Sequence, residues 1–198
     1  MLYGGALAFS RVFSLITFPV LARHFSVADY GLIDFFTVLA GLLATFFIFG
    51  QDSAIARYFY EYEDEDARRQ LISQSLILQM GFVLTLLPLL WIAARMIVTK
   101  LSDATVAELL LKLILVQVPF LVLINFSQNL LKWTFVRSRF LIMSLGYAVL
   151  NVALLLVAVL IFNIGMVGVL GVSLVVQMFS GLVGLFFVRR WLLIPRNF

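Results

Sequence analysis

The sequence predicts an all-α protein, a bundle of six helices that crosses a membrane as a polytopic membrane protein. Hydrophobic residues make up 64% of the chain and charged residues only 12%, which is far from the balance of a soluble domain. Six apolar stretches each reach the length of about 20 residues that is needed to cross the hydrocarbon core of a bilayer. Their apolar residues run continuously instead of alternating, which argues against a β-barrel.

The six predicted spans form a single transmembrane lobe, residues 1–198, because no loop is long enough to be a separate folded domain. The first span could be mistaken for a signal peptide, but Arg11 interrupts its apolar run and no small-residue cleavage site follows. The predicted spans are residues 3–22, 31–50, 71–94, 107–127, 140–162 and 166–188.

The positions of the basic residues indicate the orientation, because Lys and Arg are enriched in cytoplasmic breaks. Nine lie in the breaks on one side and three in the breaks on the other, so both termini are predicted to be cytoplasmic. Orientation explains the basic excess, and no nucleic-acid partner is expected. The nine are Arg57, Arg68, Arg69, Lys132, Arg137, Arg139, Arg189, Arg190 and Arg196, and the three are Arg23, Arg95 and Lys100.

The densest run of charge, ARYFYEYEDEDARRQ at residues 56–70, falls in the cytoplasmic break between the second and third spans. It holds five of the ten acidic residues, but it lacks the periodic ligand spacing of a calcium loop. Cysteine is absent and His24 is the single histidine, so a Cys/His metal site cannot be built, and we expect no metal and no cofactor. We expect the acids from Glu61 to Asp66 to form a solvated helical turn that tolerates substitution, and Arg57 to be the sensitive residue.

Arg11 stands out because it falls near the middle of the first span. It lies about 12 Å along a helix from Tyr3 and about 16 Å from Ala22. A central Arg costs roughly 2.5 to 3.5 kcal/mol on membrane insertion, so we expect it to face a wet cavity or a partner acid. Ser14 and Thr17 fall beside it on a helix. Alternatively, Arg11 bonds to backbone carbonyls or a neighbouring acid and only fixes helix packing.

The second span places Asp34, Thr37, Gly41, Thr45 and Asp52 on one face of a continuous helix. The two acids are about 27 Å apart along such a helix, near its two mouths. This stripe fits the wall of a cavity, but Thr and Gly also suit a seam along which another helix packs. The residues alone leave both interpretations open.

The sixth span carries a stripe of small and polar residues that predicts helix packing rather than transport. Two isolated amides, Gln79 in the third span and Gln117 in the fourth, are expected to bond across helices. The stripe consists of Ser173, Gln177, Ser180 and Gly184.

Two segments near the N-terminus have a familiar pattern: GGALAFSRVFSLITFPVLARHFSVADYGL at residues 4–32 and GQDSAIARYFYEYEDEDARRQLISQSL at residues 50–76. They contain an Arg in the first span, a Pro at its outer end, a short F-S-x-x-D-Y-G turn, and an Arg-Tyr followed by an acidic linker with basic ends. The pattern resembles the O-antigen type of polysaccharide flippase, in the multidrug/oligosaccharidyl-lipid/polysaccharide exporter superfamily. The resemblance covers all six spans in layout and carries motifs mainly over the first 76 residues.

The resemblance implies an exporter of about 12 to 14 helices, in which two six-helix lobes surround a central cavity and work by alternating access. This chain would be the N-terminal lobe, and a missing remainder or another chain would supply the second. The implied cargo is an undecaprenyl-diphosphate-linked oligosaccharide. The resemblance also implies a location in the inner or plasma membrane, in contact with membrane lipid. The implied process is O-antigen and lipopolysaccharide biosynthesis for the cell envelope.

The resemblance also suggests roles for the polar residues. Arg can bind diphosphate oxygens through two parallel hydrogen bonds, whereas hydroxyls and carboxylates can bind sugars. Arg11 is the first candidate for the pyrophosphate, and Arg57 is the second, as an entry-side contact or gate. Asp34 and Asp52 could bind sugars, hold these arginines in place, or carry protons that couple flipping to an ion gradient. Weaker candidates for the cavity wall are Ser14, Thr37 and Thr45.

Three other functions fit the sequence less well. A membrane enzyme of envelope-glycan assembly would need a nucleophile, base or acid near one interface, and only the acidic run offers a dense candidate, so no enzyme is expected. A multidrug exporter half from the same superfamily would favour an acidic, aromatic cavity, and Arg11 argues against it. The third alternative is a purely structural six-helix subunit.

Overall fold

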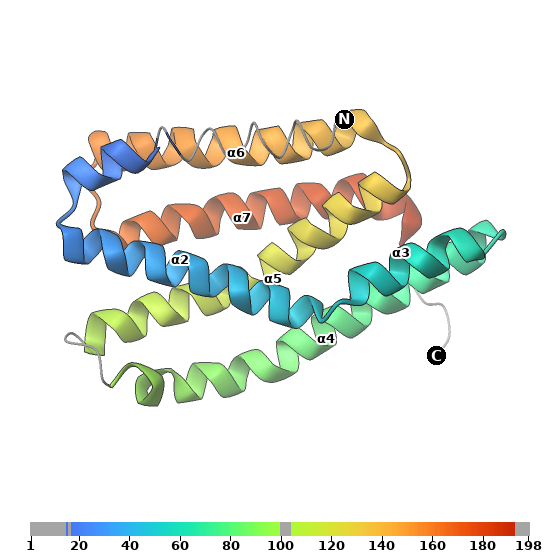
Figure 1. Ribbon diagram of the computed structural model, residues 1–198, viewed down its shortest axis with the longest axis horizontal. Helices are drawn as coiled ribbons and strands as arrows, with labels where there is room; N and C mark the ends of the chain where they lie inside the picture. The colour runs from blue at the N-terminus through green and yellow to red at the C-terminus, as the bar shows by residue number, and fades with distance from the viewer. Residues whose placement is uncertain (1–14, 16, 100–103, 193–198) are drawn as a thin grey trace.

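The computed structural model describes residues 15, 17–99 and 104–192, and every regular element in these ranges is helical (Figure 1). Five of the described helices are long and apolar enough to cross a membrane, which confirms a polytopic all-α membrane protein. The first predicted span, residues 3–22, lies mostly outside the described residues, although residues 17–24 are helical. The elements are α2 (Val27–Ile48), α3 (Gln51–Glu61), α4 (Glu65–Val98), α5 (Ala104–Trp133), α6 (Arg137–Leu160), α7 (Met166–Val188) and the 3-10 helix η1 (Arg189–Trp191).

The acidic run forms the junction between α3 and α4 and is not one helical turn. Asp64 is the N-cap of α4, and its carboxylate accepts a hydrogen bond from the Ala67 N–H at 3.0 Å. Glu65 and Asp66 lie in the first turn, where negative charge stabilises a helix. These interactions allow α4 to begin well before the predicted span of 71–94. Asp64 is therefore expected to tolerate substitution less well than the other acids of the run.

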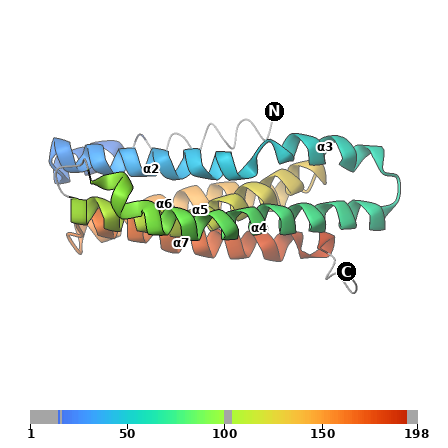
Figure 2. The same cartoon turned by 90° about the horizontal axis from the view of Figure 1, so that it is seen from below.

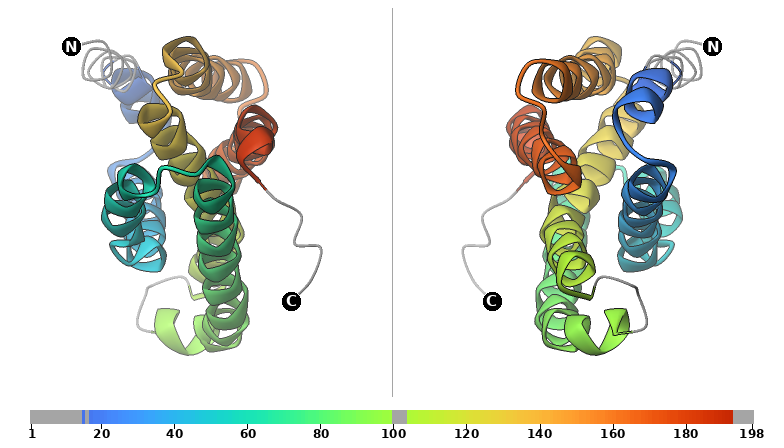
Figure 3. Two further views of the ribbon diagram at one scale, coloured as in Figure 1. Left: turned by 90° about the vertical axis from the view of Figure 1, so that its right-hand side faces the viewer. Right: turned by 90° about the vertical axis from the view of Figure 1, so that its left-hand side faces the viewer.

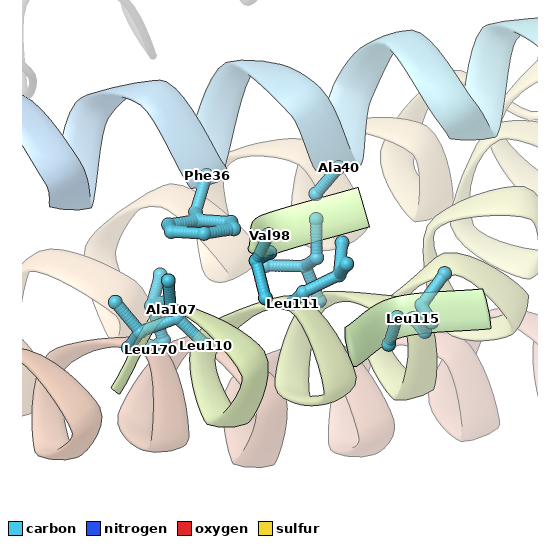
Figure 4. Packing of buried hydrophobic residues seen from close by; sticks show 10 residues of the cluster. Phe36, Ala40, Val98, Ala107, Leu110, Leu111, Leu115 and Leu170 are labelled. Carbon is cyan, nitrogen blue, oxygen red and sulfur yellow. The ribbon is translucent and has the colours of Figure 1, made fainter. Parts of the chain in front are cut away.

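α5 is the central helix of the bundle, and α2, α4, α6 and α7 all pack against it. The end views show it crossing obliquely between α6 and α7 on one side and α2 and α4 on the other (Figure 3). A large cluster of buried apolar side chains joins α2, α4, α5 and α7 near one end of α5 (Figure 4). The cluster includes Phe36, Ala40, Val98, Ala107, Leu110, Leu111, Leu115 and Leu170.

Small residues allow α7 to approach α5 and α6 closely. A Cβ atom added to Gly184 would lie 2.6 Å from Met143 Cε and 2.8 Å from Ser127 Oγ. The Gln117 amide of α5 donates to the carbonyl oxygen of Leu170 in α7 at 2.8 Å, which confirms the bond across helices predicted for Gln117. Gln177, Ser180 and Gly184 are buried, so the stripe on the sixth span is a packing surface, as predicted.

Gly184→Ala is expected to destabilise the bundle, because the added methyl group collides with α5 and α6; overpacking of this kind typically costs about 1 to 3 kcal/mol. The measurement is the thermal unfolding midpoint of the purified chain in a mild detergent. Gly146→Ala in α6 is the matched control, because a Cβ there meets no described residue within 4 Å. Because alanine favours a helix more than glycine does, Gly146→Ala should leave the thermal midpoint unchanged or raise it. Equal midpoints for the two variants would contradict the close packing at Gly184.

Candidate functional site

The polar stripe of α2 faces away from the other described helices. Asp34, Thr37, Gly41 and Thr45 are all exposed, and a Cβ added to Gly41 would meet nothing within 4 Å among the described residues. Each Thr hydroxyl donates to the carbonyl four residues earlier, at 2.7 Å for Thr37 and 2.9 Å for Thr45. Within the described part of the chain, the stripe is not a packing seam. The opposite, buried face of α2 consists of Ile33, Phe36, Ala40, Ala44 and Phe47.

Asp52 does not continue this stripe, so the prediction of one polar face from Asp34 to Asp52 is wrong. Phe49 and Gly50 both adopt left-handed backbone conformations, with φ of 52° and 68°, and they end α2 (Figure 2). Glycine favours this conformation, and the Phe49 N–H is shared between the carbonyl oxygens of Thr45, at 3.3 Å, and Phe46, at 3.1 Å, in the last turn of α2. The prediction assumed an unbroken helix, whereas the break reorients α3.

The break brings Asp52 into a polar group with residues from α4 and α5, which we call the Asp52 cluster: Gln51, Asp52, Gln79, Asn129 and Lys132. The Asn129 side-chain amide donates to Asp52 Oδ2 at 2.6 Å, and Lys132 Nζ donates to Asn129 Oδ1 at 3.1 Å. The Gln79 side chain lies beside the carboxylate. Asp52 Oδ1, Gln51 Oε1 and both polar side-chain atoms of Gln79 are buried without a well-formed hydrogen bond among the described residues.

Burial raises the pKa of the Asp52 carboxyl above its ordinary value. The hydrogen bond from Asn129 and the positive charge of Lys132 act in the opposite direction, but the net change is upward. A carboxyl group in this setting takes up a proton more readily than an exposed one. The Asp52 cluster can therefore hold a proton between helices that belong to different parts of the bundle.

An apolar recess of about 240 Å³ adjoins the Asp52 cluster at the α2–α3 break. The amides of Gln51 and Gln79 are its polar groups, and aromatic rings supply much of the rest. Its lining residues are Phe47, Ile48, Phe49, Gln51, Leu78, Gln79 and Phe82. Sequence reasoning missed the grouping of Asp52 with Gln79 and Asn129, because these residues lie on three separate helices. The only signal was the placement of polar side chains in or beside apolar runs.

Arg57 lies on α3, and its side chain is 77% exposed. Its Nε donates to Glu61 Oε1 at 3.0 Å, one helical turn away. Arg11 and Ser14 lie outside the described residues. Of the predicted site residues, the structure therefore groups Asp34, Thr37 and Thr45 on one face and separates them from Asp52 and Arg57. Within the described ranges, no group of three or more His, Asp or Glu side chains is placed to hold a metal ion.

These features define a multi-pass helical membrane protein with polar groups along an exposed face of one span. The family model for polysaccharide biosynthesis proteins matches residues 3–198. The chain belongs to this family, whose members are typically transporters, and this confirms the resemblance to flippase-type proteins drawn from the sequence. No curated protein and no solved structure matches the chain. The protein therefore has a role in polysaccharide biosynthesis.

Asp52→Asn is expected to change how stability depends on pH. The folded-state pKa of Asp52 lies above the unfolded-state value, so the folded state binds the proton more tightly. The contribution of Asp52 to the stability of the wild type should therefore be greatest at acidic pH and be lost as pH rises through the raised pKa. The introduced Asn side chain cannot take up this proton, so the stability of the variant does not depend on it. The variant should therefore gain stability relative to the wild type as pH rises from acidic to neutral.

The measurement is the thermal midpoint of both proteins across this pH range. Glu63→Gln removes an exposed carboxylate in the α3–α4 turn and serves as the charge-matched control. If the difference between Asp52→Asn and the wild type were the same at every pH, Asp52 would not have a raised pKa.

Proposed function

We propose that this chain translocates a lipid-diphosphate-linked oligosaccharide across the cell membrane, by alternating access together with a second six-helix lobe. The observation that carries the proposal is the polar face of α2, which turns away from the described helices although α2 is apolar and long enough to span a membrane. The cargo would be an undecaprenyl-diphosphate-linked glycan, as in O-antigen biosynthesis, and the membrane the inner or plasma membrane.

The outward position of the polar face supports a water-filled cavity next to α2. Asp34 lies about 10 Å along the helix from its start, and an ionised carboxylate at this depth is unfavourable against lipid. A second lobe facing α2 would enclose Asp34 and the hydroxyls of Thr37 and Thr45 in a shared wet space. Carboxylates and hydroxyls in such a space suit the hydroxyl groups of a glycan.

The arginines are proposed to bind the diphosphate. Arg11 is the candidate inside the cavity, and Arg57 is the candidate for first contact at the cytoplasmic entrance. The exposed guanidinium of Arg57 forms its one ion pair among the described residues with Glu61, and a solvent-exposed pair of this kind adds little to stability. A phosphate could therefore replace Glu61 with little loss of stability.

Of the three roles considered for Asp52, proton carriage receives the most support. The groups beside its carboxylate are Asn129, Gln79 and Lys132, and Arg57 is not among them. Its burial favours uptake of a proton over contact with a large glycan. In this proposal, a change in the protonation of Asp52 would alter the contact between α3 and α5, and so couple an ion gradient to the movement of the lobe.

The first test measures lipid-linked glycan on the inner leaflet of cells that lack the full-length gene. We expect the glycan to accumulate when the gene is deleted and to be cleared again when the wild-type gene is returned. The Arg11→Ala variant is expected not to clear it. Without accumulation on deletion, the proposed function is wrong. Full rescue by Arg11→Ala would show that Arg11 is not needed for binding, but it would not contradict the proposed function.

Thr45→Val probes the cavity wall in the same cells, and Thr85→Val in α4 is its matched control. Both hydroxyls are exposed and donate to the carbonyl of a glycine four residues earlier. Thr45→Val is expected to slow clearance of the glycan by severalfold, because one hydrogen bond contributes about 0.5 to 1.5 kcal/mol, and Thr85→Val to have no effect. Equal effects would show that α2 has no special role.

The second test separates Arg57 from the acidic run. Arg57→Ala is expected to reduce glycan clearance without changing the thermal midpoint, since its ion pair is exposed. Asp64→Ala is expected to do the reverse: loss of the N-cap should cost about 1 kcal/mol of stability and leave clearance per folded molecule unchanged. The assignment of Arg57 to the entrance fails if Asp64→Ala abolishes clearance at normal protein level while Arg57→Ala does not.

A further inference from the structure

Three arginines line a recess of the bundle. The recess lies at the end where α4 and α6 begin and α5 and α7 end, and Figure 1 shows these helix ends side by side. This is the end that the distribution of basic residues predicts to be cytoplasmic. The recess has a volume of about 340 Å³ and is separate from the Asp52 cluster. Its lining residues are Glu65, Arg69, Leu131, Thr134, Val136, Arg139, Phe187, Arg190 and Trp191.

Acidic residues neutralise only one of these arginines. Arg69 pairs with Glu65 at 2.6 Å and lies 3.7 Å from Asp66, while its Nε is buried without an acceptor among the described residues. Arg139 donates through Nη1 to the Phe187 carbonyl oxygen at 3.1 Å, which uses one of its five N–H groups. Within the described ranges, no carboxylate pairs with Arg139 or Arg190. The recess therefore keeps an excess of positive charge and several unused donors.

The surroundings of these donors indicate the kind of anion that would fit. Guanidinium groups bind phosphate oxygens in a planar, two-pronged geometry. Trp191 and Phe187 line the same recess, and aromatic side chains at the ends of membrane spans lie at the level of the lipid headgroups. The position combines phosphate-binding donors with an aromatic wall at the membrane surface. We propose that this recess binds the phosphate of an anionic phospholipid headgroup.

Membrane orientation alone does not account for this arrangement. The positive-inside rule requires basic residues at this end, but it does not require them to share a recess. Arg137 illustrates the difference: it begins α6 at the same end, is exposed, and does not line the recess. Arg137 and Arg190 carry the same charge at the same end, so a comparison of the two separates a binding site from a general electrostatic attraction.

The test is a native mass spectrometry titration of the full chain in a neutral detergent with short-chain phosphatidylglycerol. Parallel arms use short-chain phosphatidylcholine and inorganic phosphate. We expect saturable binding of phosphatidylglycerol, weaker binding of phosphatidylcholine, and no displacement of phosphatidylglycerol by an equal concentration of inorganic phosphate. Phosphate that displaces the lipid at equal concentration would identify a site for free anions and overturn the lipid assignment.

Arg190→Gln is expected to weaken phosphatidylglycerol binding by about tenfold or more, as expected for hydrogen bonds to a charged group. Arg137→Gln should weaken phosphatidylglycerol binding by no more than about fivefold, which corresponds to the general electrostatic attraction between one basic residue and an anionic lipid. Arg190 is exposed, so its loss should leave the thermal midpoint unchanged, and measuring that midpoint excludes unfolding as the cause. Equal losses in the two variants, or no saturable binding by the wild type, would overturn the proposal. The result does not depend on glycan transport.

Discussion

The close contact between α5 and α7 is the interaction on which the rest of the bundle depends. Lipid is as apolar as the helix surfaces, so membrane helices associate through tight packing and polar contacts rather than through a hydrophobic driving force. Gly184 supplies the space for tight packing, and the bond from Gln117 to the Leu170 carbonyl supplies a polar contact. Because α2, α4 and α6 also pack on α5, its position relative to α7 fixes the position of each of them.

This arrangement determines where the polar groups of α2 can go. The face of α2 that contains Phe36 and Ala40 packs toward α5, and the face with Asp34 and Thr37 must therefore point outward. The break at Gly50 then changes the direction of the chain, so that Asp52 reaches Asn129. Asp34 and Asp52 thus have different environments: Asp34 is open to the outer face of the bundle, and Asp52 is partly buried between helices.

The arginines at the predicted cytoplasmic end also differ in environment, although a count of charges treats them alike. Arg57 projects from α3 with a single exposed ion pair, and Arg69 is shared between two acids. Arg139 bonds to a carbonyl at the end of α7, and Arg190 lines the same recess without a described ion pair. Each of them is consistent with the predicted orientation, but only their positions in the fold separate a surface charge from a group available to a ligand.

The sequence by itself determined the fold class, the approximate helices and the family, because long apolar runs and their polar breaks are local properties that a bilayer enforces. It also identified the small-residue stripe on α7 as packing, since Ser180 and Gly184 recur at helical spacing. It could not give the contact of Asp52 with Asn129, which lies 77 residues away, or the convergence of Arg139 and Arg190. Helical projection gave the wrong face for Asp52, because two left-handed residues interrupt the helix. Only the tertiary structure decided these groupings, since they depend on how separate helices cross and on one local break in the backbone.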